Sequence, residues 1–315
     1  PDREHGGFWA RVTPDLKTKT RSPKGLVLNA RILWAFSAAG RQYHDPAFIG
    51  LAERAYQEIA NRFLDPLYGG VFWMLDAEGR PLDDSKKIYG QAFAIYSLVE
   101  YYRAGANSDA LNLARAIYEL IEKHQYDPAE TGYLETANRD WSPALTLRLS
   151  DVDLDEKKSM NSHLHMLEAY TQLYRVWPDP VLRGRLVGLV NNFLDNIIEP
   201  DSFHLALYFD EKWNRKSGRI SFGHDIETSW MLDEAAEVLG DPILTRKCKK
   251  VAVAMAEVVL AQGLNPAGGV FYEVTEAGEI DRDVHWWVQA EAVVGFFNAF
   301  QNSGRSEFLQ AAARA

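Results

Sequence analysis

Apolar residues along the chain form two kinds of helical segment that alternate. The first kind is apolar on nearly every side, as in residues 26–34 and 91–98, which is typical of a buried helix. The second kind carries apolar residues at helical spacing beside charges, as in residues 48–56, and this pattern predicts a helix with one exposed face. Apolar helices are predicted to begin near residues 24, 86, 159, 221 and 285, and amphipathic ones to cover 46–56, 108–123, 178–197 and 241–262.

Short aromatic segments and proline-marked helix starts repeat with these helices. Gly-Gly-Phe-Trp at residues 6–9 returns as Gly-Gly-Val-Phe-Trp at 69–73 and Gly-Gly-Val-Phe-Tyr at 268–272. A polar turn and then an apolar helix follow the later copies, and apolar helices recur every 60–75 residues. Three amphipathic helices are expected to start at an Asp-Pro pair, because proline suits the first turn of a helix: Asp45-Pro46, Asp179-Pro180 and Asp241-Pro242.

These repeats predict an all-α fold, an (α/α) barrel of helical hairpins with short β segments in the loops. The apolar helices would line a central cavity and the amphipathic helices would face solvent. Residues 1–315 would form a single catalytic domain. Only five apolar helices are visible in the pattern, whereas a six-hairpin barrel needs more chain at both ends. We therefore expect the barrel to be incomplete, without its first outer helix and its last inner helix.

Charge and cysteine content limit the binding partners and the cellular location that can be expected for the protein. The formal net charge of −10 comes with no basic run, which argues against nucleic-acid binding. No apolar run approaches the length of a membrane helix, and no signal peptide is visible. The single cysteine, Cys248, cannot form an internal disulfide and is interpreted as a structural thiol, so a reducing cytoplasm is expected. We also expect a monomer.

Two helix-borne histidine motifs are the strongest candidates for chemistry. His165 and Glu168 are three residues apart and share a helix face, and His224 and Glu227 repeat this spacing. His163 and His165 point to nearly opposite sides and cannot jointly hold a metal ion. Di-metal helical bundles use the reverse order, Glu-x-x-His, with further carboxylates, so no metal is predicted. Each glutamate would instead hold its imidazole for acid/base catalysis, with His163 in a supporting role.

Further candidates lie on the other apolar helices. Arg31 is expected to be buried, where it would either stabilise an anionic oxygen in a transition state or form a structural ion pair. Trp286 and Trp287 start the last apolar helix and suggest a platform for a sugar ring, and Tyr89 occupies the matching place in the second repeat. For any one of these rings, packing in the core is the competing interpretation.

Three long motifs resemble those of cellobiose 2-epimerases, within the N-acylglucosamine 2-epimerase superfamily. They cover residues 27–34, 158–171 and 222–230, stand in the expected order and extend the resemblance over essentially the whole chain. The resemblance implies an (α/α)6 barrel and a reaction without a cofactor. In that reaction the sugar ring opens, the C2 proton is removed to give a cis-enediolate, and reprotonation on the other face inverts C2.

The resemblance also implies roles for individual residues. Arg31 would steady the enediolate, His165 would assist ring opening, His224 would be one of two C2 acid/base groups, and Glu227 would orient His224 and the sugar. Substrate contacts would fall to Tyr89, Asp153, Asn161 and Trp287, with Trp286 and Glu168 beside them. The family's second C2 histidine, which follows a tryptophan, has no match in residues 1–315. Efficient epimerisation is therefore expected only if the polypeptide also includes the segment that carries this histidine.

The substrate expected from this resemblance is a reducing β-1,4-disaccharide such as cellobiose or lactose. An aldose–ketose isomerase acting on free mannose, or an N-acylglucosamine 2-epimerase, would use related chemistry. A glycoside hydrolase would need two carboxylates beside the scissile bond, and Asp153, Asp155, Asp225 and Glu227 are available. A sugar-binding protein without catalytic activity is the remaining alternative.

Overall fold

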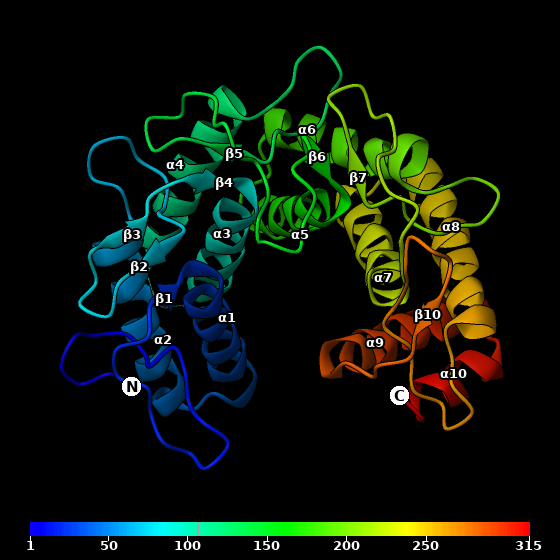
Figure 1. Cartoon of the computed structure of the whole chain (residues 1–315), viewed down its shortest axis with the longest axis horizontal. Helices are drawn as coiled ribbons and strands as arrows, with labels where there is room; N and C mark the ends of the chain where they lie inside the picture. Colours follow the sequence, from blue (N-terminus) through cyan, green and yellow to red (C-terminus); the bar gives the residue numbers. More distant parts are fainter. Residues whose placement is uncertain (106) are drawn as a thin grey trace. The chain divides into compact units, whose positions relative to one another are not determined.

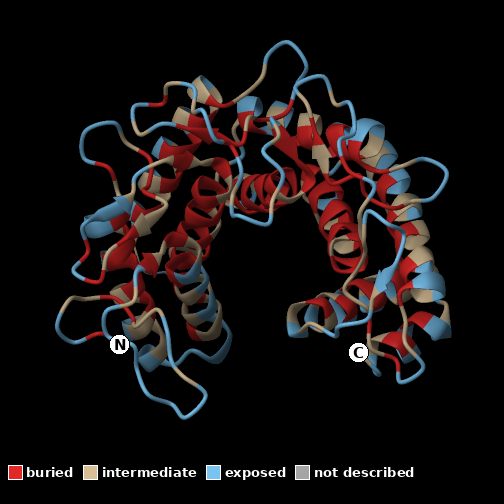
Figure 2. Cartoon of the chain, viewed as in Figure 1, coloured by how far each residue is buried: buried red, intermediate tan, exposed pale blue. Residues whose placement is uncertain are grey.

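The computed structural model describes residues 1–105 and 107–315 and shows a succession of helical hairpins (Figure 1). The apolar helices begin within two residues of the predicted positions, and we call them the inner helices. Figure 2 shows that α3, α5 and α7 are buried along most of their length. The inner helices are α1 (Leu26–Tyr43), α3 (Ile88–Arg103), α5 (Met160–Val176), α7 (Phe222–Leu239) and α9 (Trp286–Ser303).

The amphipathic helices also form where the pattern predicts them. Asp45, Asp179 and Asp241 cap three of them, with proline as the first helical residue. Asp45 accepts one hydrogen bond from a backbone N–H group of the first turn, and Asp179 and Asp241 accept two each. Two of these helices continue into a π-helical turn, η1 (Ile59–Phe63) and η2 (Phe193–Ile197). The outer helices are α2 (Pro46–Glu58), α4 (Ser108–His124), α6 (Pro180–Asn192), α8 (Pro242–Gln262) and the short α10 (Ser306–Ala312).

The loops contain short antiparallel strands, as predicted. Their pairing follows the orders β1-β2-β3, β4-β5, β6-β7 and β8-β9-β10. Several aromatic segments make a single β-bridge back to the end of the preceding outer helix, as Val71 does to Leu64. The strands are β1 (Lys24–Gly25), β2 (Met74–Leu75), β3 (Pro81–Asp83), β4 (Lys86–Lys87), β5 (Thr136–Ala137), β6 (Lys158–Ser159), β7 (Tyr208–Phe209), β8 (Ile220–Ser221), β9 (Glu273–Val274) and β10 (Ile280–Asp281).

Contacts divide the chain into two compact units, and the boundary falls within α5. In the first unit, which holds most of residues 1–155 and also 168–178, α1 packs on α3 while α2 and α4 cover their outer sides. In the second unit, which holds most of residues 156–315, α7 packs on α8 and α9, and α10 packs on α9. The organisation of residues 1–315 as a single domain stays a prediction.

In α3 and α9 the fourth helical residue anchors the backbone of a nearby aromatic loop. The Gln91 amide accepts from the backbone N–H of Val71 at 2.9 Å and donates to its carbonyl at 2.8 Å. Gln289 makes the same pair of bonds with Val270. These bonds satisfy backbone groups that are buried, so each loop is held on its helix independently of its own side chains.

Asp225 is the anchor at the fourth position of α7. Its carboxylate accepts from the backbone N–H of Leu205 at 3.0 Å and from Nδ1 of His204 at 2.7 Å. Burial would lower the pKa of His204, but the hydrogen bond to the carboxylate outweighs it and raises this pKa above its usual value. The first turn of α7 is therefore tied to its loop by a buried, hydrogen-bonded histidine–aspartate pair.

Buried lysines stand two residues before three of the inner helices. Lys24, Lys86 and Lys158 are each at most 2% exposed. Lys86 pairs with Asp65 at 2.9 Å, and Arg139 also donates to Asp65. Burial would raise the pKa of Asp65, but the hydrogen bonds from Arg139 and Lys86 hold it well below its usual range.

Asp65→Asn should lower the free energy of unfolding by about 3–5 kcal/mol, because it leaves the buried Lys86 cation without its counter-charge. Urea unfolding followed by circular dichroism measures this change. The difference should shrink as the pH falls through about 4, where the unfolded wild-type chain takes up a proton at this carboxyl. Asp195→Asn, in an exposed ion pair with Lys247, is the matched control and should change stability little. Equal effects of the two variants would contradict the expectation.

In the described part of the chain, no helix is both long and apolar enough to cross a membrane. Cys248 is fully buried on α8, and burial raises its pKa to about 12. The thiol is therefore unreactive at neutral pH, as the sequence predicts for a structural cysteine. The cytoplasmic location stays a prediction.

Candidate active site

Seven of the ten predicted site residues share a register on the inner helices. When each inner helix is counted from its first residue, positions 2, 6 and 9 are four and three residues apart and lie on one face. Position 2 holds Val27, Tyr89, Asn161, Gly223 and Trp287. Position 6 holds Arg31, Phe93, His165, Glu227 and Glu291, and position 9 holds Trp34, Tyr96, Glu168, Trp230 and Val294.

His224 lies at position 3 of α7, beside this face. Its Nδ1 is 2.7 Å from Oγ of Ser221, the residue that caps α7. The Ser221 oxygen also accepts the backbone N–H of His224, so its own proton is available for Nδ1. Proton transfer to a substrate would therefore use Nε2. Ser221 therefore holds the imidazole at Nδ1, and the role of Glu227 in orienting it stays a prediction.

Trp287 packs against His224, with ring centroids 5.0 Å apart. A Cβ atom on Gly223 would lie only 2.5 Å from the Trp287 ring, so only glycine permits this close approach of α7 and α9. Trp287 is also nearly perpendicular to the ring of Tyr272, with centroids 6.4 Å apart, and Tyr272 stacks on His285 with centroids 4.0 Å apart. Trp287 is thus fixed within a row of rings. Trp286 is 77% exposed, so the structure does not bring it into this row.

His165 and Glu168 follow one another on α5 at positions 6 and 9, and both are buried, with 6% and 8% exposed. His163 is fully buried, and its Nδ1 donates to the carbonyl of Ser159 at 2.7 Å. Burial lowers the pKa of His163 to about 4, so this imidazole is neutral at physiological pH. These contacts agree with the supporting role predicted for His163.

Arg31 corrects one expectation from the sequence. The arginine was expected to be buried because α1 is apolar on most sides, but its side chain is exposed. The guanidinium lies over the ring of Phe93, 4.9 Å from the centroid, at the same position of the neighbouring helix α3. A short apolar pattern cannot distinguish a helix buried all round from one with an open side, and α1 has such a side. An arginine held on an aromatic face can still receive an anionic oxygen.

Tyr89 and Asn161 both lie at position 2 and are half-buried. The ring of Tyr89 contacts Phe93 and the edge of Trp73, with centroids 5.0 and 6.4 Å apart. In the described chain, no donor bonds the buried Oδ1 of Asn161. A buried acceptor without a protein donor is suited to a ligand hydroxyl. Asp153 lies in the loop before α5, where Ser150 Oγ donates to its carboxylate.

The register adds side chains that sequence reasoning did not select. Trp34 and Tyr96 stack across α1 and α3 with centroids 5.4 Å apart. Trp230 Nε1 donates to Glu291 Oε2 at 3.0 Å, joining α7 to α9. All four occupy positions 6 or 9, so alignment of the five inner helices by their first residues would have found them. These polar and aromatic groups suit recognition of hydroxyl groups and C–H faces.

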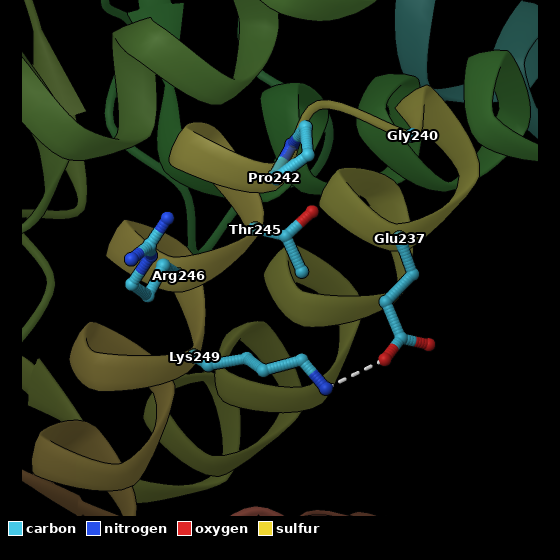
Figure 3. Close-up of a pocket in the computed structure, with 6 residues that line it drawn as sticks. All are labelled: Glu237, Gly240, Pro242, Thr245, Arg246 and Lys249. Atoms are coloured by element: carbon cyan, nitrogen blue, oxygen red, sulfur yellow. Dashed lines mark hydrogen bonds and ion pairs between the residues drawn. The ribbon is translucent and has the colours of Figure 1, made fainter.

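Among residues 1–105 and 107–315, no three His, Cys, Asp or Glu side chains gather in a way that could hold a metal ion. A hollow of about 510 Å³ lies elsewhere, between the end of α7 and the start of α8 (Figure 3). Glu237 and Lys249 form an ion pair beside it, at 2.7 Å. Because Glu237 is thirteen residues from His224, this hollow is about 20 Å along the helix from the candidate site and has no part in it.

Comparison with known proteins gives the family. The model of the N-acylglucosamine 2-epimerase (GlcNAc 2-epimerase) family matches residues 7–315. A cellobiose 2-epimerase from Bacteroides fragilis is 44% identical over 310 residues, which cover 98% of this chain and 79% of the relative. The chain belongs to the N-acylglucosamine 2-epimerase family. Members of this family are carbohydrate epimerases and isomerases, so the protein is an enzyme of the isomerase class.

Other relatives and solved structures agree with this family. A cellobiose 2-epimerase from Dictyoglomus turgidum is 38% identical over 98% of this chain and 79% of its own length. The structure of a cellobiose 2-epimerase from Bacillus thermoamylovorans has a TM-score of 0.95 at 38% identity, covering 99% of this chain and 80% of that one. A D-mannose isomerase structure, at 20% identity with a TM-score of 0.85 and covering 100% and 79%, shares the fold alone. The predicted all-helical (α/α)6 barrel class of this family is confirmed.

Proposed function

We propose that the enzyme inverts C2 of the reducing glucose unit of β-1,4-disaccharides, converting cellobiose to glucosyl-mannose and lactose to epilactose. The cellobiose 2-epimerases at 44% and 38% identity support this substrate class. The observation that carries the chemistry is the seating of His224. Its imidazole is fixed at Nδ1 by Ser221 and packs on Trp287. A general acid or base has to be held in this way beside a sugar ring that stacks on a neighbouring aromatic side chain.

The proposed reaction moves protons only and needs no cofactor or metal. The ring opens with the help of His165, beside which Glu168 lies. A base then removes the C2 proton, and the electron pair passes to the C1 oxygen to form a cis-enediolate. Return of a proton to the opposite face of C2 inverts the centre. His224 is one of the two acid/base groups that this inversion requires.

The remaining candidates bind and stabilise the sugar. Arg31 stabilises the enediolate oxygens, and its support by Phe93 orients the guanidinium. Glu227 orients His224 and a sugar hydroxyl. Asn161 offers a buried acceptor that has no donor among the described residues. The remaining substrate contacts come from Tyr89, Asp153, Trp286 and Trp287. We further propose that the enzyme works in the cytoplasm as a monomer.

The test is the wild-type protein with cellobiose in deuterated water, followed by proton NMR. We expect a glucosyl-mannose signal to grow in and deuterium to enter at C2. A ketose product would instead indicate an aldose–ketose isomerase, the activity that the name of a D-mannose isomerase from Thermobifida fusca gives to a relative 24% identical over 79% of this chain. Released glucose would indicate a glycoside hydrolase. Binding of cellobiose without C2 exchange would indicate a sugar-binding protein.

A further inference from the structure

Lys87 is a charged side chain that the proposed reaction does not use, and it holds a loop. It lies in β4, next to Lys86, and successive strand residues point to opposite faces. Lys86 therefore points to Asp65, whereas Lys87 points to residues 147–155, a segment without regular strands or helices. Only 12% of the Lys87 side chain is exposed.

The Lys87 ammonium group binds the loop backbone. Nζ donates to the carbonyl of Leu149 at 3.0 Å and to that of Arg148 at 3.3 Å. The same nitrogen lies over the Trp73 ring, 4.8 Å from its centroid, and 4.0 Å from the Asp83 carboxylate. Burial lowers the pKa of Lys87, whereas the carboxylates of Asp83 and Asp153 oppose this shift. Lys87 thus ties the loop to the aromatic segment beside Tyr89.

Four further hydrogen bonds fix the path of the same loop. Asp155 accepts from the backbone N–H groups of Leu147 and Arg148, at 2.6 and 3.1 Å. Thr136 Oγ1 donates to the carbonyl of Leu147 at 2.6 Å. Asp153 lies in the same loop, and its backbone N–H donates to the carbonyl of Ser150. The position of Asp153 is therefore set by a loop whose fixed points include Lys87.

We propose that Lys87 is a positioning residue that fixes the loop at residues 147–155 and so places Asp153 for binding of the disaccharide. This inference rests on the proposed function, in which Asp153 contacts the sugar. Lys87 touches neither the reacting carbon nor the residues given acid/base roles, so its removal should weaken binding of the substrate more than it slows the chemical step.

Lys87→Met tests the proposal, because methionine keeps the length and apolar packing of the side chain but cannot donate. We expect KM for cellobiose to rise about tenfold, the usual effect of losing a charge-assisted hydrogen bond, with kcat nearly unchanged. Asp153→Asn should raise KM by a similar factor. If Lys87 acts through Asp153, the double variant should resemble either single variant, whereas independent effects would multiply to about a hundredfold. A multiplied effect would overturn the proposal.

Limited trypsin digestion measures how firmly the loop is held and does not depend on enzyme activity. Lys87 binds the carbonyl of Arg148, which belongs to the peptide bond that trypsin cleaves, and the Arg148 side chain is 44% exposed. Lys87→Met should speed cleavage after Arg148 about tenfold, while cleavage after Arg21 stays constant. Asp155→Ala removes the acceptor of the Leu147 and Arg148 N–H groups and should have the same effect on KM and on cleavage, which covers the case in which Lys87→Met fails to fold.

Lys123→Met, an exposed lysine on α4, is the matched control and should match wild type in KM and in cleavage after Arg148. Unchanged cleavage and unchanged KM in Lys87→Met would overturn the proposal, as would a fall in kcat and thermal stability without a rise in KM. A wild-type protein that leaves cellobiose unchanged would refute the proposed function. The digestion would then still show whether Lys87 holds the loop.

Discussion

His224→Asn should lower kcat for C2 epimerisation by about 10²–10⁴-fold, which is the usual contribution of a positioned general acid or base. Asparagine keeps a polar side chain near Ser221 but cannot take up or release the C2 proton. Sugar binding should be retained, because Trp287 and the other rings are unchanged, so KM should change little. Product formation and C2 deuterium exchange, both followed by NMR, measure the effect.

His44→Asn is the matched control for this substitution. His44 caps the end of α1 with a φ of 55°, a left-handed conformation that asparagine adopts readily. We expect this variant to keep wild-type kcat and stability. A His224→Asn protein that kept more than about a tenth of wild-type kcat would assign the C2 proton to another group and would remove His224 from the proposed mechanism.

Arg31→Met should lower kcat/KM by about 10²–10³-fold, because a donor aimed at a developing oxyanion contributes that much in other enzymes. The methionine side chain can still pack on Phe93, so the fold around α1 should survive. Steady-state rates with cellobiose measure the loss. The loss should appear mainly in kcat, since the negative charge develops only as the enediolate forms.

Arg31→Lys separates charge from geometry. Lysine keeps the positive charge but lacks the planar fork that lies over Phe93, so its activity should fall between that of wild type and that of Arg31→Met. Arg21→Met, at an exposed position before β1, is the matched control and should be silent. Full activity of Arg31→Met would show that the enediolate does not depend on this arginine.

The helices were predictable because their signals are local. An apolar run buried on most sides and the Asp-Pro pairs at 45–46, 179–180 and 241–242 place helix starts to within about two residues, since N-caps and proline act within one turn. The spacing of His224 from Glu227, and of His165 from Glu168, likewise fixes which side chains share a face. These inferences need no knowledge of tertiary contacts.

The contacts that seat the site were not predictable, because they join residues far apart in the chain. His204 and Asp225 are 21 residues apart, and Lys87 and Leu149 are 62 apart. The exposure of Arg31 was missed for the same reason, since the neighbours of a helix decide which of its sides is covered. Glu291 and Trp230 were within reach of an alignment of the inner helices, but their mutual hydrogen bond was not.

The backbone anchors at Gln91 and Gln289 have a consequence for how this fold can change. Each amide is hydrogen-bonded to the backbone of one loop residue, Val71 or Val270. The neighbouring side chains of the loop take no part in these bonds. Substitutions in the half-buried rings that follow, Trp73 and Tyr272, would leave these backbone bonds in place. In evolutionary terms, the type of ring at these two places can differ from one repeat to the next while the main-chain attachment of the loop is kept.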